Sequence, residues 1–110
     1  MMLVKAIVRP GKMEAVREAL ERLDLSGITI LEVRGHGRQQ GHTTVYRGHG
    51  YVTTLLRRVE IDVVVGDYMV EEVVEAVVRA ARTGEVGDGR VFVLPVAEAH
   101  NIRTGERNVI

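Results

Sequence analysis

Glycine and arginine residues gather in three separate segments of this chain: GHGR at 35–38, TGEVGDGR at 83–90 and IRTGER at 102–107. Successive backbone N–H groups in a glycine-rich turn can face one point and bind an anion, and arginine binds phosphate or carboxylate oxygens in pairs. The 83–90 segment lacks the GxxxxGK[ST] pattern and leads into a predicted strand instead of a helix. Its spacing alone also fits a plain helix-to-strand turn, but the three segments together favour a site for a phosphate and a purine.

The stretch from Gly35 to Arg58 has the most unusual composition. It contains no Asp or Glu, but four arginines and three of the four histidines, whereas the whole chain balances 15 basic against 15 acidic residues. A loop of about twenty residues in a compact domain is expected to be functional. We therefore predict a long exposed loop at about 36–57 that meets an anionic ligand or a partner surface. The irregular spacing of its histidines favours solvated side chains over a metal site.

Length and composition bound the other possibilities. The 110 residues suffice for one domain, covering 1–110. The absence of cysteine excludes disulfides and thiolate metal sites. No apolar run approaches the ~18 residues of a membrane span, so we expect a cytoplasmic protein. A pI near 6.9 argues against bulk nucleic-acid binding.

Hydrophobic periodicity predicts six elements around the long loop. Apolar, β-branched stretches predict strands and the 3.6-residue repeat predicts helices. Asp67 is expected to cap the second helix. The expected strands are Met1–Arg9, Ile28–Arg34, Val59–Val65 and Val91–Val96, and the expected helices are 12–23 and 70–81, followed by a polar tail at 98–110.

This order, β-α-β, loop, β-α-β, predicts an α+β fold of the ferredoxin-like βαββαβ type. One antiparallel four-stranded sheet would carry both helices on one face. The other face should not be strongly polar, because apolar residues such as Ile30, Val91 and Val93 occupy both parities of their strands. Trimer or dimer formation is the simplest way to cover it.

The segments GHGRQQGHTTVYRGHGY, TGEVGDGRVFV and IRTGE, in this order and spacing, resemble the PII nitrogen-regulatory signal-transduction family over essentially the whole chain. The resemblance implies a homotrimer whose long loop, the T-loop, is the effector arm. It implies that ATP or ADP binds between neighbouring subunits and that 2-oxoglutarate binds beside Mg²⁺-ATP at the loop base. The loop would dock onto an ammonium transporter or a nitrogen-assimilation enzyme, so that the protein meets a membrane only through a transporter and binds no nucleic acid.

The resemblance also assigns residues to these sites. For the 2-oxoglutarate site it implies Gln39, Gln40, Gly41 and Arg58, with Mg²⁺ held by the ATP phosphates, 2-oxoglutarate and Gln39. Tyr51 matches a tyrosine that many members have nucleotidylated. For the nucleotide site it implies Thr29, Gly35, Gly37, Arg38, Gln39, Val64, Gly87, Asp88, Gly89, Arg90 and Arg103.

Five positions depart from the family pattern. Arg58 and Arg90 stand where lysines are usual, which exchanges a compact charge for a planar fork. Asn101 replaces a second tail arginine and removes one cation from the phosphates. Gln40 replaces a lysine, and Gly50 replaces the glutamate before Tyr51.

Three other functions remain open from the sequence. One is a PII-like regulator of nitrogenase or of another transporter that senses mainly the ATP/ADP ratio. Another is a weak nucleotide hydrolase, against which the chain shows no nucleophile–base pair. The last is an RNA-binding ferredoxin-like module, but such modules stack bases on several sheet aromatics, and Phe92 is the only Phe.

Overall fold

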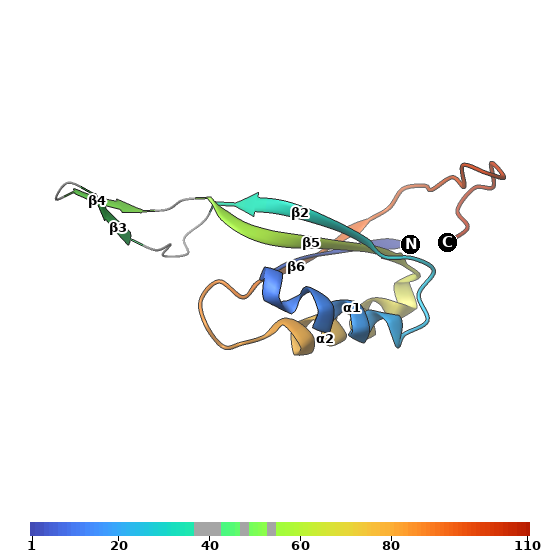
Figure 1. Cartoon of the computed structure of the whole chain (residues 1–110). Helices are drawn as coiled ribbons and strands as arrows, with labels where there is room; N and C mark the ends of the chain where they lie inside the picture. Colours follow the sequence, from blue (N-terminus) through green and yellow to red (C-terminus); the bar gives the residue numbers. More distant parts are fainter. Residues whose placement is uncertain (37–42, 47–48, 53–54) are drawn as a thin grey trace.

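The computed structural model describes residues 1–36, 43–46, 49–52 and 55–110, with the two middle segments described as backbone only. Six main elements follow one another around the long loop (Figure 1). They are β1 (Met2–Val8), α1 (Met13–Glu21), β2 (Thr29–Gly35), β5 (Leu56–Val65), α2 (Val70–Ala81) and β6 (Gly89–Pro95). Single 3₁₀ turns, Pro10–Lys12 and Asp67–Met69, lead into the two helices.

The sheet confirms the predicted ferredoxin-like α+β fold. Its strand order is β2-β5-β1-β6, and every neighbouring pair is antiparallel. Both helices cover one face and leave the other face open (Figure 1). The two central strands, β1 and β5, are therefore neighbours in space although α1 and β2 separate them in the sequence.

The core lies between the sheet and the helices, where the alternation of each strand places its branched residues. Val59, Ile61, Val63 and Val65 of β5 are buried, while Glu60 and Asp62 between them face the open side, as the sequence predicts. The helices contribute the predicted stripe residues Val16, Leu20, Val73, Val77 and Ala81, all buried. Each large apolar side chain buried in this way contributes roughly 1.5–3 kcal/mol.

The open face is partly apolar, but its residues differ from those expected. The strand register places Ile30, Val91 and Val93 on the helix side, opposite Ile61, Ala6 and Val4. The apolar residues of the open face include Leu31, Phe92 and Leu94, each about two-fifths exposed. At its centre Lys5 Nζ lies 3.7 Å from Glu60 Oε2.

The long loop contains secondary structure that the sequence did not predict. Strands β3 (Thr43–Tyr46) and β4 (His49–Val52) pair antiparallel as a hairpin, and β5 begins at Leu56, earlier than predicted. Thr, Val and Tyr favour strands, but the surrounding glycines and the lack of an apolar period concealed this preference.

The cap predicted for the second helix is wrong. Asp67 starts the 3₁₀ turn, and its carboxylate accepts no capping hydrogen bond from α2, whose N-terminus has no side-chain capping bond. Instead Asp67 Oδ1 lies 2.6 Å from the backbone nitrogen of Met1. The Asp67 carboxylate therefore forms an ion pair with the N-terminal ammonium of Met1. It does not cap α2, as the local spacing predicts.

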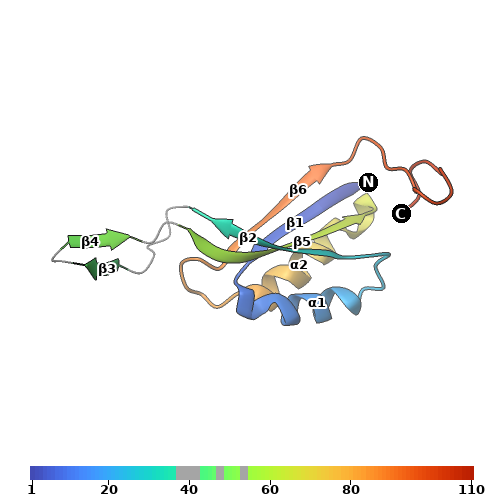
Figure 2. The ribbon, with the colours of Figure 1, turned by 45° about the horizontal axis from the view of Figure 1, so that its top comes forward.

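The two ends of the sheet carry different features. The long loop and the 83–88 segment lie at one end, while the C-terminal tail leaves from the other end, beside the start of β1 (Figure 2). There the Val96 amide donates to the Met1 carbonyl at 3.1 Å. Within the tail, His100 and Arg107 form an antiparallel bridge around the predicted turn at Thr104 and Gly105. No helix in the described part of the chain is long and apolar enough to cross a membrane.

Candidate nucleotide and effector site

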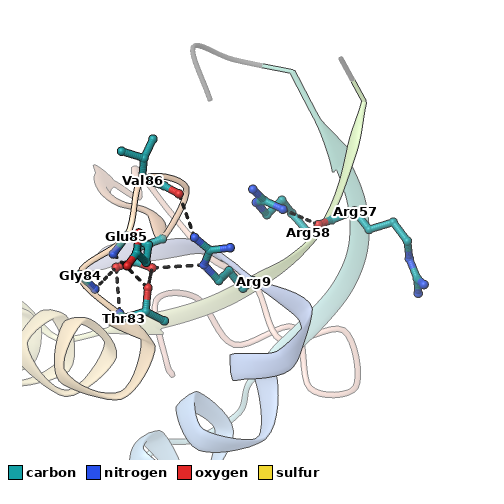
Figure 3. A network of polar contacts seen from close by, with 8 residues as sticks. Arg9, Arg57, Arg58, Thr83, Gly84, Glu85 and Val86 are labelled. Carbon is teal, nitrogen blue, oxygen red and sulfur yellow. Dashed lines mark hydrogen bonds and ion pairs between the residues drawn. The ribbon is translucent and has the colours of Figure 1, made fainter. Parts of the chain in front are cut away.

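The segment between α2 and β6 folds around the carboxylate of Asp88 (Figure 3). Asp88 Oδ2 accepts from the amides of Thr83 at 2.8 Å and Gly84 at 2.9 Å. The Thr83 hydroxyl donates to Asp88 Oδ1, and its oxygen accepts from the Glu85 amide at 3.1 Å. The amides of 83–85 are thus satisfied inside the loop. In the described part of the chain, no hydrogen bond is donated by the amides of Val86 and Gly87, the two central residues of a turn.

Arg9 ties this loop to β1, a contact that the sequence analysis missed. Its Nε donates to Asp88 Oδ1 at 3.2 Å and its Nη2 donates to the Val86 carbonyl at 2.8 Å. Arg9 and Asp88 are 79 residues apart in sequence, so no local sequence pattern predicts that they form a pair. The register supplies the reason, because Val8 lies opposite Gly89, directly before and after the two charged residues.

The same bonds hold the pKa of Asp88 well below its usual range. The Thr83 hydroxyl makes the largest contribution, followed by the Thr83 amide, and Arg9 adds a smaller one. Each donor stabilises the ionised form. The carboxylate is therefore ionised at neutral pH and bonded within the loop, so that the groups left to meet a ligand are the backbone amides of Val86 and Gly87 directly before it.

Gly89 is required at the point where the loop enters β6. Its φ is +107°, and a Cβ at this position would lie 1.8 Å from the Ile7 carbonyl oxygen. Gly87 also has a positive φ, +99°. Only glycine takes such values at little cost, which explains why both predicted glycines flank the aspartate.

The predicted nucleotide residues fall at the two ends of the sheet. Gly35 ends β2 on the side of the long loop, and Gly87, Asp88, Gly89 and Arg90 lie at the same end. Thr29, opposite Asp62, and Val64, opposite Leu3, lie several residues further along the strands. Arg103 belongs to the C-terminal tail, which leaves from the other end of the sheet (Figure 2). Within one chain, the tail segment therefore does not reach the end of the sheet that holds Gly35 and the 83–90 segment.

Asn101 takes part in the tail turn. Its Oδ1 accepts from the Thr104 amide at 3.0 Å, and its carbonyl accepts from the Gly105 amide at 2.7 Å. The residue that replaces the expected arginine therefore has a structural role, and Arg103 lies in the turn that Asn101 stabilises and is exposed.

Arg58 lies at the root of the long loop, beside Gly35. A Cβ on Gly35 would lie 3.8 Å from Arg58 Cγ. Arg58 Nη1 donates to the Arg57 carbonyl at 2.8 Å, whereas Nη2 is buried and has no partner among the described residues. A buried guanidinium nitrogen without an acceptor costs free energy, so this atom fits an incoming anion.

Several of the predicted nucleotide and effector residues belong to the long loop. Gly37, Arg38, Gln39, Gln40 and Gly41 lie outside the described residues. For Tyr51 the structure describes only the backbone, as part of β4.

The fold and the site define a class: a ferredoxin-like α+β domain with a long loop between its second and third sheet strands and a glycine-rich segment beside the root of that loop. A sequence profile of the family "Nitrogen regulatory protein P-II" matches residues 1–106. This chain belongs to that family.

Curated members of the family are similar over nearly their whole length. The chain is 49% identical to the nitrogen regulatory protein P-II of Rhodospirillum rubrum over 104 residues, which cover 94% of this chain and 93% of the relative. It is also 49% identical to that of Azospirillum brasilense over the same shares. It is 48% identical to that of Haemophilus influenzae, covering 96% of this chain and 94% of the relative.

Proposed function

We propose that this P-II protein is a non-enzymatic, homotrimeric sensor of adenine nucleotides and 2-oxoglutarate. It binds ATP or ADP, binds 2-oxoglutarate together with Mg²⁺-ATP, and regulates an ammonium transporter or a nitrogen-assimilation enzyme through its long loop. The protein works in the cytoplasm and reaches the membrane by docking onto a transporter. Its relatives are named nitrogen regulatory proteins, in agreement with a regulatory role.

The division of the predicted nucleotide residues between two ends of the sheet carries this proposal. Gly87–Arg90 lie at the loop end, whereas Thr29, Val64 and Arg103 lie toward the other end. One chain cannot wrap them around one nucleotide. Two copies can, if the far end of one subunit meets the loop end of the next. A partly apolar open sheet face gives such copies a surface on which to associate.

The free amides and the arginines fit the phosphates. The amides of Val86 and Gly87 have hydrogen atoms to donate, and Arg90 follows them on β6. Arg103 of a neighbouring copy would supply a second cation. Charge-assisted bonds of this kind are about twice as strong as neutral ones.

For 2-oxoglutarate the supporting observation is the unpartnered Nη2 of Arg58. A guanidinium can bind the far carboxylate with two parallel bonds. The keto-acid end would meet Mg²⁺, which ATP phosphates and Gln39 help to hold. Because ADP lacks the γ-phosphate, 2-oxoglutarate should bind only in the presence of Mg²⁺-ATP.

A subunit-mixing experiment tests the two-ended nucleotide site. The variants Arg90→Ala and Arg103→Ala should each weaken ADP binding by about 1–3 kcal/mol, as measured by calorimetry. Random mixing of the two variants should restore about one quarter of the sites to wild-type affinity, because some sites then receive both arginines. Light scattering should give three times the monomer mass of 12.2 kDa. A monomer, or mixed protein with no restored sites, would overturn the proposal.

Calorimetry with 2-oxoglutarate tests the effector site. Arg58→Gln should abolish 2-oxoglutarate binding and leave ATP affinity nearly unchanged. If 2-oxoglutarate binds equally well with ADP, or binds Arg58→Gln normally, this chain senses the ATP/ADP ratio alone.

A further inference from the structure

Two arginines face each other across the strands that carry the long loop. Arg34 on β2 lies directly opposite Arg57 on β5, one pair before the last, Gly35 with Leu56. Opposed residues in antiparallel strands have Cβ atoms about 4.5–5.5 Å apart, and like charges at this separation destabilise the pairing. Both side chains are exposed. The root of the loop therefore holds an unfavourable charge pair.

The pair borders a hollow of about 230 Å³. The register places Arg34 and Arg57 on the same face as Val59, the side that the helices cover. Pro10, at the start of the 3₁₀ turn before α1, closes the hollow from that side. Because a water molecule takes about 30 Å³, the space is sufficient for a phosphate or carboxylate group.

The charges around the hollow do not cancel. Three arginines line it, Arg34, Arg57 and Arg58, against a single acid, Glu32. Within the described residues neither Arg34 nor Arg57 forms an ion pair. Residues 37–54 contain no Asp or Glu, so the rest of the loop has no carboxylate to offer either.

The pair lies on the opposite face of β5 from Arg58. Arg57 and Arg58 point to opposite sides of β5 (Figure 3). The Arg58 guanidinium folds back onto the Arg57 carbonyl, whereas the Arg57 side chain lies on the face shared with Arg34. An anion between Arg34 and Arg57 would therefore meet the helix-side face, although Arg58 also borders the hollow.

The geometry points to a second anion site, in which Arg34 and Arg57 bind one phosphate or carboxylate group on the helix side of the loop root. The bound anion converts the repulsion between the arginines into two attractions and so stabilises the last strand pairs of β2 and β5. Occupancy thereby restrains the direction in which the long loop leaves the sheet. The site does not require that nucleotide or 2-oxoglutarate bind elsewhere.

Site-resolved NMR tests this inference. In protein with ¹⁵N-labelled arginine, the Nε–Hε signals of Arg34 and Arg57 are followed while inorganic phosphate replaces chloride at constant ionic strength. Both signals should shift along one saturating curve. Arg57→Gln should weaken the phosphate response of Arg34 about tenfold or more. Arg34→Lys keeps the charge but loses the fork and should also weaken it.

Three matched variants separate this site from other effects. Arg22→Gln, which removes one exposed charge at the end of α1, should leave the curve unchanged. Arg58→Gln should weaken phosphate binding less than Arg57→Gln does, because Arg58 borders the hollow from the opposite face of β5, and the same variant should lose 2-oxoglutarate. Glu32→Gln should tighten phosphate binding severalfold, because it removes the one competing carboxylate.

The outcomes show whether the site exists and which kind of anion it binds. Titration with a tri-glutamate peptide in place of phosphate distinguishes an acidic segment of a partner from a free oxyanion. A response to either probe that Arg57→Gln removes supports the site. A linear, unsaturated response of Arg34, or the same curve in Arg57→Gln as in the wild type, overturns it.

Discussion

The 83–88 loop and the root of the long loop lie at the same end of the sheet, but their charged side chains differ in whether they have bonding partners within the chain. In the 83–88 loop, the Asp88 carboxylate is surrounded by donors from Thr83, Gly84 and Arg9. At the long-loop root, Arg34 faces Arg57 without an acid between them, and Arg58 Nη2 has no described partner. The carboxylate of the first region is bonded by donors of the chain itself, whereas the arginines of the second region form no ion pair among the described residues. The shape of the 83–88 loop is therefore held by internal bonds, while the proposal for the root makes its strand pairing depend on a bound anion.

The largest effect is expected for Gly89→Ala, at the residue directly after the 83–88 loop. The added Cβ would collide with the Ile7 carbonyl, and the backbone has a φ of +107°. We expect a loss of about 3 kcal/mol or more in the free energy of unfolding, measured with urea. Gly84→Ala is the matched control, because Gly84 also has a positive φ, +91°, but open space around its Cβ; it should cost about 1 kcal/mol. Equal losses in both variants would contradict the close approach to β1.

A second test uses pH to break the internal network of the same loop. The folded pKa of Asp88 lies below its ordinary value near 3.8. A depressed carboxyl pKa stabilises the folded loop above the unfolded value and loses this contribution as pH falls through the folded value. The amide signals of Thr83 and Gly84 should therefore stay constant from neutral pH down to about 4 and move only in stronger acid.

The Asp88→Asn variant is the control for that titration. It should shift both amide signals at neutral pH and abolish their acid transition, since no carboxylate remains to be protonated. A transition of Thr83 and Gly84 between pH 5 and 7 in the wild type would show that Asp88 is not held as the structure indicates.

The smallest expected effect concerns the root of the long loop. Arg57→Gln removes the repulsion across β2 and β5 and should stabilise the protein by about 0.5 kcal/mol at low salt in a phosphate-free buffer. The gain should shrink as salt is added, because the Debye length falls to about 8 Å at physiological ionic strength. Arg22→Gln should show no such gain. Destabilisation by Arg57→Gln in chloride alone would mean that the pair is already compensated.

The fold was predictable because its signals are local. The helical repeat places Val16 and Leu20 of α1, and Val73 and Val77 of α2, in the core, and the alternation in β5 separates Ile61 from Asp62. The predictions failed where a distant group competes for a side chain. Met1 takes the carboxylate of Asp67 from the helix terminus, and the β3–β4 hairpin depends on pairing that composition does not reveal.

The candidate site was predictable only in part. Glycines mark the 83–90 loop, and the positive φ values of Gly87 and Gly89 give the physical reason. Arg9 was missed because its partner lies 79 residues away, and the opposed Arg34 and Arg57 become visible only once the register of β2 and β5 is known. Contacts set by strand register cannot be derived from the spacing of residues along the chain.

The bond between Arg9 and the 83–88 loop has a consequence for how the chain folds. Arg9 follows the first strand and Asp88 precedes the last one, so the loop acquires its shape only after β1 and β6 have paired. That pairing closes a long stretch of chain and therefore carries a large loop-closure entropy. A ligand that recognises the finished loop binds the native state but not an intermediate in which β6 is still detached. Such a ligand would stabilise the edge strand against detachment by mass action, and its occupancy would report that the sheet is complete.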